Sequence, residues 1–390
     1  MHDTREKTCC NVKYRIGVCI WLGLLLCSNA FSKTGGSVRL QAAQQYDSNS
    51  ARISGNETAG DFLTRVLIKG QLFFEKNQHT LWARLQEGGK IFYHHEQEDQ
   101  IVSAFYAGYR FGWGQNSSGI KINLRDMTQY HHTRDYFQVS AAAFLSFELR
   151  PSVSMEILTG ARHYTFKPDP VPIGEDKYTR FTNTGPMAQL RLDARLDENW
   201  SINVSYGLGI RFFNDVAYEF IQESLPDASL CHDEQGCLLP TGFERVDYNH
   251  SLGLSIKLSA NWFLQYVMMA KVSYLATFND SNSTGSTAIW HRMRAVLSLQ
   301  LPLDLTLHLM GTFQLTDYPD GINLLFDLYE PDADENENSA VVRLTWRFAA
   351  KFQLVLEGAL YRGAMALGDV GNADFSRQTL LMGLAWGWQH

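Results

Sequence analysis

The sequence predicts an all-β protein, a transmembrane antiparallel up-and-down β-barrel of about 16 strands with short periplasmic turns and long extracellular loops. Three observations predict it. Apolar side chains recur at every second position in many segments, the chain ends on an apolar stripe, and the connections alternate between short and long. Repeated alternation of this kind, with turn residues between the segments, is typical of such barrels.

Period-two alternation is clearest in residues 201–212, where every even residue is apolar and every odd residue is small or polar. Similar runs lie at 119–125, 249–258, 303–315 and 341–348. Because successive side chains of a strand point to opposite faces, each run predicts one apolar face and one polar face. No segment after residue 30 is apolar over helix-spanning length and mean hydropathy is −0.22, which argues against a helical membrane protein.

The prolines help to place the connections, because proline cannot donate a ladder hydrogen bond. Nine of the ten lie between the alternating runs, including Pro240, and Pro186 lies near the start of a run. The expected strands are 37–47, 61–75, 79–95, 98–113, 118–130, 133–149, 152–167, 177–196, 200–220, 243–258, 262–279, 285–301, 304–318, 337–348, 352–367 and 374–388. Every long connection then falls at the same end of the barrel.

The last expected strand carries an apolar stripe at alternate positions from Leu380 to Trp388. A bilayer would cover this stripe, and we expect the strand to close the barrel against residues 37–47. The stripe resembles the C-terminal assembly signal of bacterial outer-membrane barrels, through Gly383, Trp386 and Trp388. The sequence departs from that pattern at Leu381, where the family favours a polar residue, and in the Gln389-His390 tail.

The N-terminal residues predict secretion. Four basic residues precede an apolar run from Ile16 to Cys27, and Ser28-Asn29-Ala30 is typical of a cleavage site. We expect residues 1–30 to be a signal peptide and residues 31–390 to be the barrel, with an uncleaved anchor and a lipoprotein as alternatives. Cleavage would change the formal charge from −7 to −9, because four basic and two acidic residues are lost. That balance is unlike a nucleic-acid-binding protein.

Of the six cysteines, only Cys231 and Cys237 lie outside the expected signal peptide. In an oxidising compartment we expect them to form a disulfide, with free thiols as the alternative. We expect no metal and no cofactor. His94-His95 and His131-His132 lie near outer strand tips, but neighbours in a strand point to opposite faces and cannot easily chelate together.

Ten basic residues on the face opposite the apolar one are expected to line the pore: Lys121, Arg125, Arg191, Arg195, Arg211, Lys257, Arg292, Arg294, Arg343 and Arg347. Acidic residues on that face are fewer, so a net acidic chain would keep a basic interior that attracts anions. The alternative is that these cations pair with the acids for stability. The long segments 317–337 and 221–242 are acidic instead, and the apolar residues 324–326 and 328–329 in the first of them suggest a constriction or plug.

Two other classes fit less well. A soluble β-sandwich would not need tryptophans near its strand ends, where Trp113, Trp200, Trp262, Trp290, Trp346, Trp386 and Trp388 mostly lie. An enzyme would need a nucleophile and a base at one rim, and the sequence shows no convincing pair, so we expect no enzymatic activity.

Residues 45–49 (Gln-Tyr-Asp-Ser-Asn) and 88–93 (Gly-Gly-Lys-Ile-Phe-Tyr) resemble segments of porin-like barrels associated with exopolysaccharide export and of the barrel of surface-lipoprotein assembly modifiers. Strand patterning begins almost directly after residue 30, so we do not expect the helical repeats that precede the latter barrel, which counts against carrying over that family's function. The resemblance implies a bacterial outer-membrane channel, a porin or an export conduit for an anionic solute or polysaccharide. A translocon for surface proteins and an adhesin or structural barrel acting through its loops are the alternatives.

The expected partners follow from this location. They are outer-membrane lipid and lipopolysaccharide, the barrel assembly machinery and periplasmic polysaccharide export components, with no nucleic acid.

Overall fold

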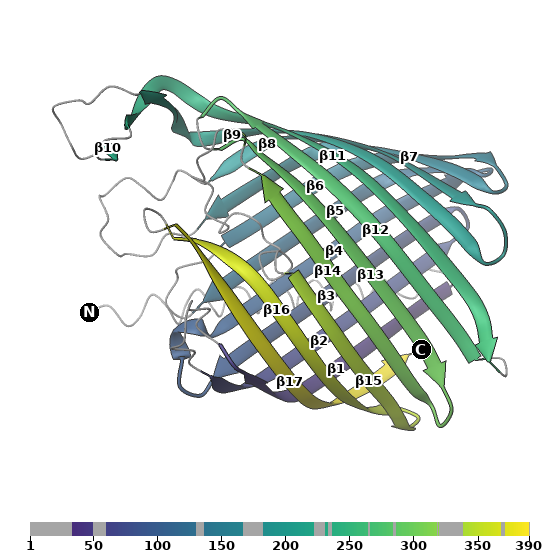
Figure 1. The fold of residues 1–390 in the computed structure, drawn as a ribbon. Helices are drawn as coiled ribbons and strands as arrows, with labels where there is room; N and C mark the ends of the chain where they lie inside the picture. The colour runs from purple at the N-terminus through teal and green to yellow at the C-terminus, as the bar shows by residue number, and fades with distance from the viewer. Residues whose placement is uncertain are drawn as a thin grey trace, which may run out of the picture.

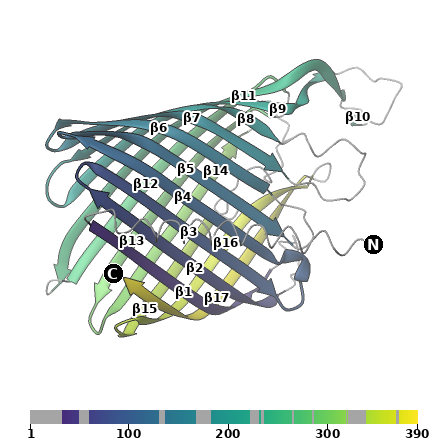
Figure 2. The ribbon, with the colours of Figure 1, turned by 180° about the vertical axis from the view of Figure 1, so that it is seen from behind.

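A computed structural model describes residues 33–49, 60–129, 136–166, 182–221, 231–232, 236–263, 266–283, 286–317, 319, 338–367 and 371–389 of the chain. These residues form one antiparallel sheet that closes on itself as a barrel (Figures 1 and 2). Sixteen long strands make the wall, and the two-residue strand β10 pairs only with β11. The predicted fold class is therefore confirmed.

The strands of the wall follow the chain order. They are β1 (Lys33–Asp47), β2 (Asp61–Lys76), β3 (His79–Phe92), β4 (Gln100–Trp113), β5 (Asn116–Gln129), β6 (Tyr136–Arg150), β7 (Val153–Phe166), β8 (Asn183–Arg195), β9 (Trp200–Ile221), β11 (Gly236–Phe263), β12 (Tyr266–Ser281), β13 (Ala288–Leu301), β14 (Leu305–Asp317), β15 (Asn338–Ala349), β16 (Phe352–Leu367) and β17 (Gly371–Gln389). The other elements are β10 (Cys231–His232) and the 3₁₀ turn η2 (Glu96–Glu98). No helix in the described part of the chain is long and apolar enough to span a bilayer.

The barrel closes where β1 pairs with β17, in a register that runs from Ser37 opposite Gln389 to Asp47 opposite Thr379. Closure leaves no unpaired edge along this seam, so the backbone groups on both strands are hydrogen-bonded inside the sheet. The expected pairing of the last strand with residues 37–47 is thus confirmed. Gly383 allows the two strands to approach, because a Cβ built on it would lie 2.5 Å from the Cβ of Ala43 and 2.6 Å from the backbone oxygen of Ala42.

Short turns gather at one end of the barrel and long connections at the other, as the sequence predicts. The β2–β3 turn needs only Asn77 and Gln78, with Asn77 at φ 54°, and the β4–β5 turn places Gly114 at φ 66°. Lys33 and Gln389 lie at the short-turn end, beside the end of β2. By the asymmetry of outer-membrane barrels, the short turns are periplasmic and the long connections are extracellular.

Strand β11 departs from the prediction at both of its ends. It begins at Gly236 rather than 243 and runs to Phe263, so the turn expected at 259–261 lies further along. Pro240 lies inside this strand rather than in a loop. The register with β9 shifts directly after it, between Pro240 and Glu244, and Gly242 has φ 79°. The irregular ladder removes the need for the hydrogen bond that proline cannot donate.

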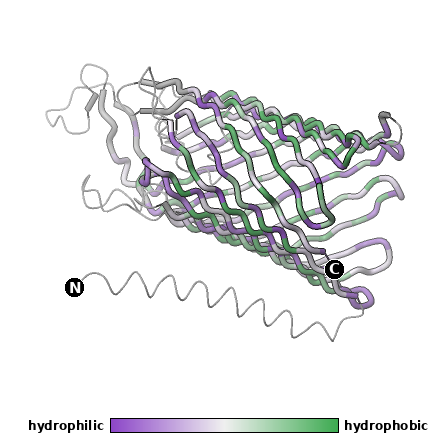
Figure 3. The backbone as a smooth tube through the Cα atoms, turned by 90° about the horizontal axis from the view of Figure 1, so that it is seen from below, coloured by the Kyte–Doolittle hydropathy of each residue, from purple (hydrophilic) through white to green (hydrophobic). Residues whose placement is uncertain are grey.

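The two faces of the wall differ in kind. Large apolar side chains are exposed on one face of the strands throughout the barrel, for example Leu380 at 67% and Met382 at 61%. Most charged residues alternate with them, and Figure 3 shows this alternation of hydrophobic and hydrophilic residues along the backbone of the strands. A bilayer covers such an apolar outer face, whereas water would not tolerate it over this area. The protein is thus a transmembrane barrel, located in the bacterial outer membrane.

Several tryptophans lie on the outer face near the short-turn end, as interfacial residues do. Trp113, Trp200, Trp346 and Trp388 are all exposed there, and Trp346, Phe348 and Phe352 form a chain of ring contacts. The prediction that Trp290 belongs to this outer group is wrong. It lies opposite Thr277 and Thr316 and two residues from Arg292, on the inner face. The side chain of Trp262 lies outside the described residues.

The seam between β1 and β17 yields a test of closure. Gly383→Ala should destabilise the barrel by about 1–3 kcal/mol, because the new methyl group must displace backbone atoms of β1. The denaturant midpoint and the heat-dependent shift in gel mobility measure this effect. Gly358→Ala in β16 is the control, since its Cβ would meet nothing within 4 Å, and equal stability of the two variants would contradict the account.

Candidate functional site: a basic belt inside the barrel

Electrostatic contacts across the barrel identify its inner face. Arg39 on β1 lies within electrostatic reach of Arg343 on β15 and of His308 on β14. Four steps around the wall separate β14 from β1, so the direct path between Arg39 and His308 crosses the lumen. Alternation along the paired strands then assigns the remaining inward positions.

Basic side chains form a belt at one height on this inner face. Each member lies four to seven residues from the short-turn end of its strand. A strand rises about 3.3 Å per residue and is tilted by about 40° from the barrel axis, so the belt lies about 10–18 Å above the periplasmic turns. The belt consists of Arg39, Lys69, Arg84, Lys121, Arg191, Lys257, Lys271, Arg294 and Arg343.

Three members of the belt are neutralised by carboxylates. Lys121 Nζ lies 2.9 Å from both carboxylate oxygens of Glu156. Arg191 Nε lies 2.8 Å from Asp193 Oδ2, and Arg343 donates to the buried carboxylate of Glu357 on the neighbouring strand. The alternative that the lumen cations pair with acids therefore holds for this part of the belt.

The other six members have no carboxylate partner among the residues that the structure describes. Within the described part of the chain, Arg39 donates to the side-chain oxygen of Gln353, at 3.4 Å, and to no carboxylate. These six cations occupy two groups of neighbouring strands: Arg39, Lys69 and Arg84 on β1 to β3, and Lys257, Lys271 and Arg294 on β11 to β13. The belt therefore keeps a surplus of positive charge facing the lumen.

All ten residues expected to line the pore occupy inward strand positions, but at different heights. Lys121, Arg191, Lys257, Arg294 and Arg343 belong to the belt. Arg195 and Arg347 lie nearer the short turns, and Arg125, Arg211 and Arg292 lie nearer the outer end. Arg125 stacks over the Tyr136 ring, and Arg292 donates to Gln314 at 2.8 Å.

Sequence reasoning missed Arg39, Lys69, Arg84 and Lys271. The first three lie in β1 to β3, where large apolar residues such as Leu63 and Phe92 also face inward and blur the alternation. Lys271 lies directly opposite Lys257, on a strand whose outward residues Val272 and Tyr274 alternate with it. Counting even and odd positions in residues 266–281 would have found it.

Near the outer end of the lumen, ion pairs are structural. Asp247 is almost fully buried and accepts hydrogen bonds from Arg245, Asn279 and Ser281, while the Arg245 guanidinium stacks on Phe213 at 4.2 Å. Arg377 lies 3.7 Å from Asp47 beside the closing seam. Buried charges need such partners, and these pairs add no surplus charge.

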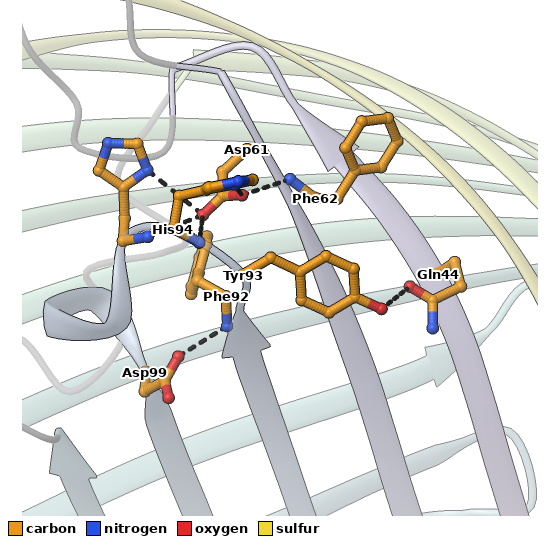
Figure 4. A network of polar contacts seen from close by, with 8 residues as sticks. Gln44, Asp61, Phe62, Phe92, Tyr93, His94 and Asp99 are labelled. Atoms are coloured by element: carbon orange, nitrogen blue, oxygen red, sulfur yellow. Dashed lines mark hydrogen bonds and ion pairs between the residues drawn. The ribbon is translucent and has the colours of Figure 1, made fainter.

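A second polar network holds the β3–β4 connection at the outer rim (Figure 4). The carboxylate of Asp61, at the start of β2, accepts the backbone N–H groups of Phe62, His94 and His95 at 2.7–2.9 Å. The Nδ1 atoms of both histidines also lie within 3.2 Å of it. Tyr93 and Asp99 extend the network, through Gln44 and the backbone N–H of Phe92.

The prediction that His94 and His95 lie in a strand is wrong. Strand β3 ends at Phe92, so both histidines lie in the connection and both rings approach Asp61. Within the described residues, no group of three His, Cys, Asp or Glu side chains is placed to hold a metal ion. Two other features of the sequence lie outside the described residues. They are His131-His132 and the acidic segment 320–337, which includes the apolar residues 324–326 and 328–329.

The backbone register places Cys231 of β10 directly opposite Cys237 of β11. Directly opposed residues of antiparallel strands have Cα atoms about 4.5–5.5 Å apart, a separation that a disulfide spans. The disulfide remains a prediction, and the register is compatible with it.

Comparison with protein-family models finds no match, and comparison with curated protein sequences finds none either. Among solved structures, the chain is similar to Pseudomonas aeruginosa OccK2, with 8% identity, a TM-score of 0.44 and coverage of 92% of this chain and 98% of that one. Acinetobacter baumannii OccAB3 has 9% identity, a TM-score of 0.43 and coverage of 92% and 100%. The Pseudomonas putida toluene transporter TodX has 9% identity, a TM-score of 0.36 and coverage of 91% and 89%.

These values are too low to carry an argument about function, and the fold rests on the strand pairing described above. The resemblance to barrels of exopolysaccharide export finds no support in these comparisons.

The hydrogen bonds that Asp61 accepts at the outer rim predict how the stability of the β3–β4 connection depends on pH. Burial opposes ionisation of Asp61, but the hydrogen bonds from His94 and His95 outweigh it and lower the pKa of this carboxyl well below its usual range. The pKa of Asp61 in the folded protein lies below its value of about 3.9 in the unfolded chain. The ionised carboxylate therefore stabilises the folded state fully above about pH 3.9, and this stabilisation is lost as the pH falls towards the folded pKa.

Hydrogen exchange of the His94 and His95 amides should therefore show protection from neutral pH down to about pH 4, with loss only below it. Asp61→Asn should remove this protection at every pH, since the amide side chain is a weaker acceptor. Asp197→Asn, in the β8–β9 turn, is a control that should leave these two amides protected. Equal protection in Asp61→Asn and the unchanged protein would contradict the assignment.

Proposed function

We propose that this barrel is an outer-membrane channel that prefers anions. The observation that carries the proposal is the basic belt, in which six of nine cations have no carboxylate partner among the described residues. A barrel of about 16 strands is wide enough for an aqueous channel. Fixed positive charge on its wall raises the local concentration of anions and lowers that of cations.

The exposure of these cations supports a role in permeation. Arg39, Arg84, Lys257, Lys271 and Arg294 are all solvent-exposed although they face the inside of the barrel. Charges placed for stability alone would be expected to bury against partners, as Arg245 does against Asp247. Acidic solutes are thus the proposed cargo, either small anions or an acidic polysaccharide.

The proposal includes the route to the membrane. Residues 1–30 act as the signal peptide, and Gly383, Trp386 and Trp388 of β17 are read by the barrel assembly machinery. Lipopolysaccharide in the outer leaflet surrounds the barrel, and export of a polymer would require periplasmic components. A non-enzymatic role without cofactors fits a channel.

Reversal potentials in planar bilayers test the ion preference. In a tenfold KCl gradient, the purified protein should give a potential displaced towards the chloride equilibrium potential. Lys257→Gln combined with Lys271→Gln should move it towards zero, because two of the six unneutralised charges are lost. Lys76→Gln, on the outer face of β2 at its short-turn end, is the matched control that should leave the potential unchanged.

A potential displaced towards the potassium equilibrium potential would contradict the proposal, as would a lumen that carries no ions at all.

The disulfide has its own test. Peptide mapping without reductant should recover the Cys231 and Cys237 peptides as one cross-linked species, and reduction should separate them with a mass gain of two hydrogens. Recovery of two free thiols from protein made in the periplasm would show that the prediction is wrong.

A further inference from the structure

The six unneutralised cations are arranged in two triads with the same geometry. In the first, Arg39 on β1 lies directly opposite Lys69 on β2. Arg84 on β3 lies opposite Gln71, two residues from Lys69, and is therefore its diagonal neighbour. Directly opposed Cβ atoms are about 4.5–5.5 Å apart and diagonal neighbours about 7–8 Å apart, so one solute can contact all three side chains.

The second triad repeats this pattern on another part of the wall. Lys257 on β11 lies directly opposite Lys271 on β12. Arg294 on β13 lies opposite Ser273, two residues from Lys271. Each triad thus combines a directly opposed pair with a diagonal arginine.

The two triads lie on roughly opposite walls of the barrel. β11 lies nine strand-to-strand steps from β1 in one direction around the sixteen-strand wall and seven steps in the other. The wall with β1 to β3 is in front in Figure 2, and the wall with β11 to β13 is in front in Figure 1. Because both triads belong to the belt, they face the same level of the lumen.

This arrangement is unfavourable for the empty barrel. Like charges directly opposite each other on neighbouring strands are destabilising, and no described carboxylate offsets them. The charges of Arg84, Arg39 and Arg343 all act on Lys69. Five of the six side chains are exposed and Lys69 is partly exposed, so the counter-charge can be supplied from the solution in the lumen.

We infer that the two triads form a paired binding site for a multiply charged anion, such as a polycarboxylate or a polyphosphate. The inference rests on the proposed anion channel and names the class of anion that it would retain. Several anionic groups on one solute can engage several cations of a triad at once, whereas a monovalent anion engages one or two. The guanidinium group of arginine can donate two parallel hydrogen bonds to one carboxylate or phosphate, and the ammonium group of lysine adds a localised positive charge.

Block of the KCl current by citrate tests the inference, with acetate at equal ionic strength as the monovalent probe. Citrate carries three carboxyl groups and should reduce the single-channel current at concentrations where acetate leaves it unchanged. Lys69→Gln and Lys271→Gln should each raise the half-blocking citrate concentration about tenfold, as expected for the loss of one charge-assisted contact. Lys69→Arg should retain the block, because the charge is kept.

Arg191→Gln is the matched control. It removes one positive charge at the height of the belt, but from a pair with Asp193 and outside both triads. The half-blocking concentration should change by less than about twofold, since this charge is already neutralised. A change as large as that of Lys69→Gln would show that only net charge matters and would overturn the paired site.

Titration calorimetry of citrate into the detergent-solubilised protein gives a readout that does not need conduction. The unchanged protein should bind citrate more tightly than Lys69→Gln and Lys271→Gln, and equal affinity in all three overturns the inference. An anion-preferring channel without citrate block or binding would overturn the paired site alone. A channel that prefers cations would overturn the proposed function while the calorimetry still decides the site.

Discussion

The structure depends on one constraint, the closure of an alternating sheet. Once β17 pairs with β1, every strand must send one set of side chains to lipid and the other to the lumen. The outer face can then be almost uniformly apolar, and polar side chains have only the inside of the barrel and its two ends available to them. A one-residue change in the register at the seam would exchange the two faces of a strand, so close contacts such as that of Gly383 with Ala43 matter.

Much of this fold could be predicted from the sequence because the constraint is local. Alternation in β9, β11 and β17 gives the face of each residue without any knowledge of its partners. The short turns are equally predictable from the sequence, because asparagine and glycine favour the left-handed conformation that tight turns require, and Asn77 and Gly114 adopt it. Strand ends were less predictable where an irregularity replaces a turn, as Pro240 and Gly242 show in β11.

The candidate site was only partly predictable. Individual inward cations could be found wherever the outward residues are apolar, but their grouping could not, because the triads depend on register between strands. In β2 and β3 the sequence did not show clearly which residues face the lumen and which face the lipid. Leu63 and Phe92 are buried on the inner face near the outer rim, and Glu87 lies opposite Ile68 on the outer one. The histidines of the rim were misplaced for a related reason, since β3 ends two residues before His94.

The lumen divides by height into two kinds of electrostatics. Near the outer end, Arg245 and Arg377 pair with buried aspartates, and these contacts serve the fold. In the belt, cations outnumber carboxylates among the described residues, and Arg39 and Lys69 oppose each other without compensation. Keeping this repulsion in the belt, while the charges of Arg245 and Arg377 near the outer end pair with buried aspartates, is the strongest physical reason to assign the belt a role in handling anions.

Anomalous diffraction from crystals soaked in bromide would show directly where the lumen holds anions. We expect bromide ions at both triads, within contact distance of Lys69 and Lys271, and few or none near the neutralised pairs of Lys121 and Arg191. Bromide confined to the outer surface, or a lumen that instead concentrates rubidium in a parallel soak, would contradict this expectation.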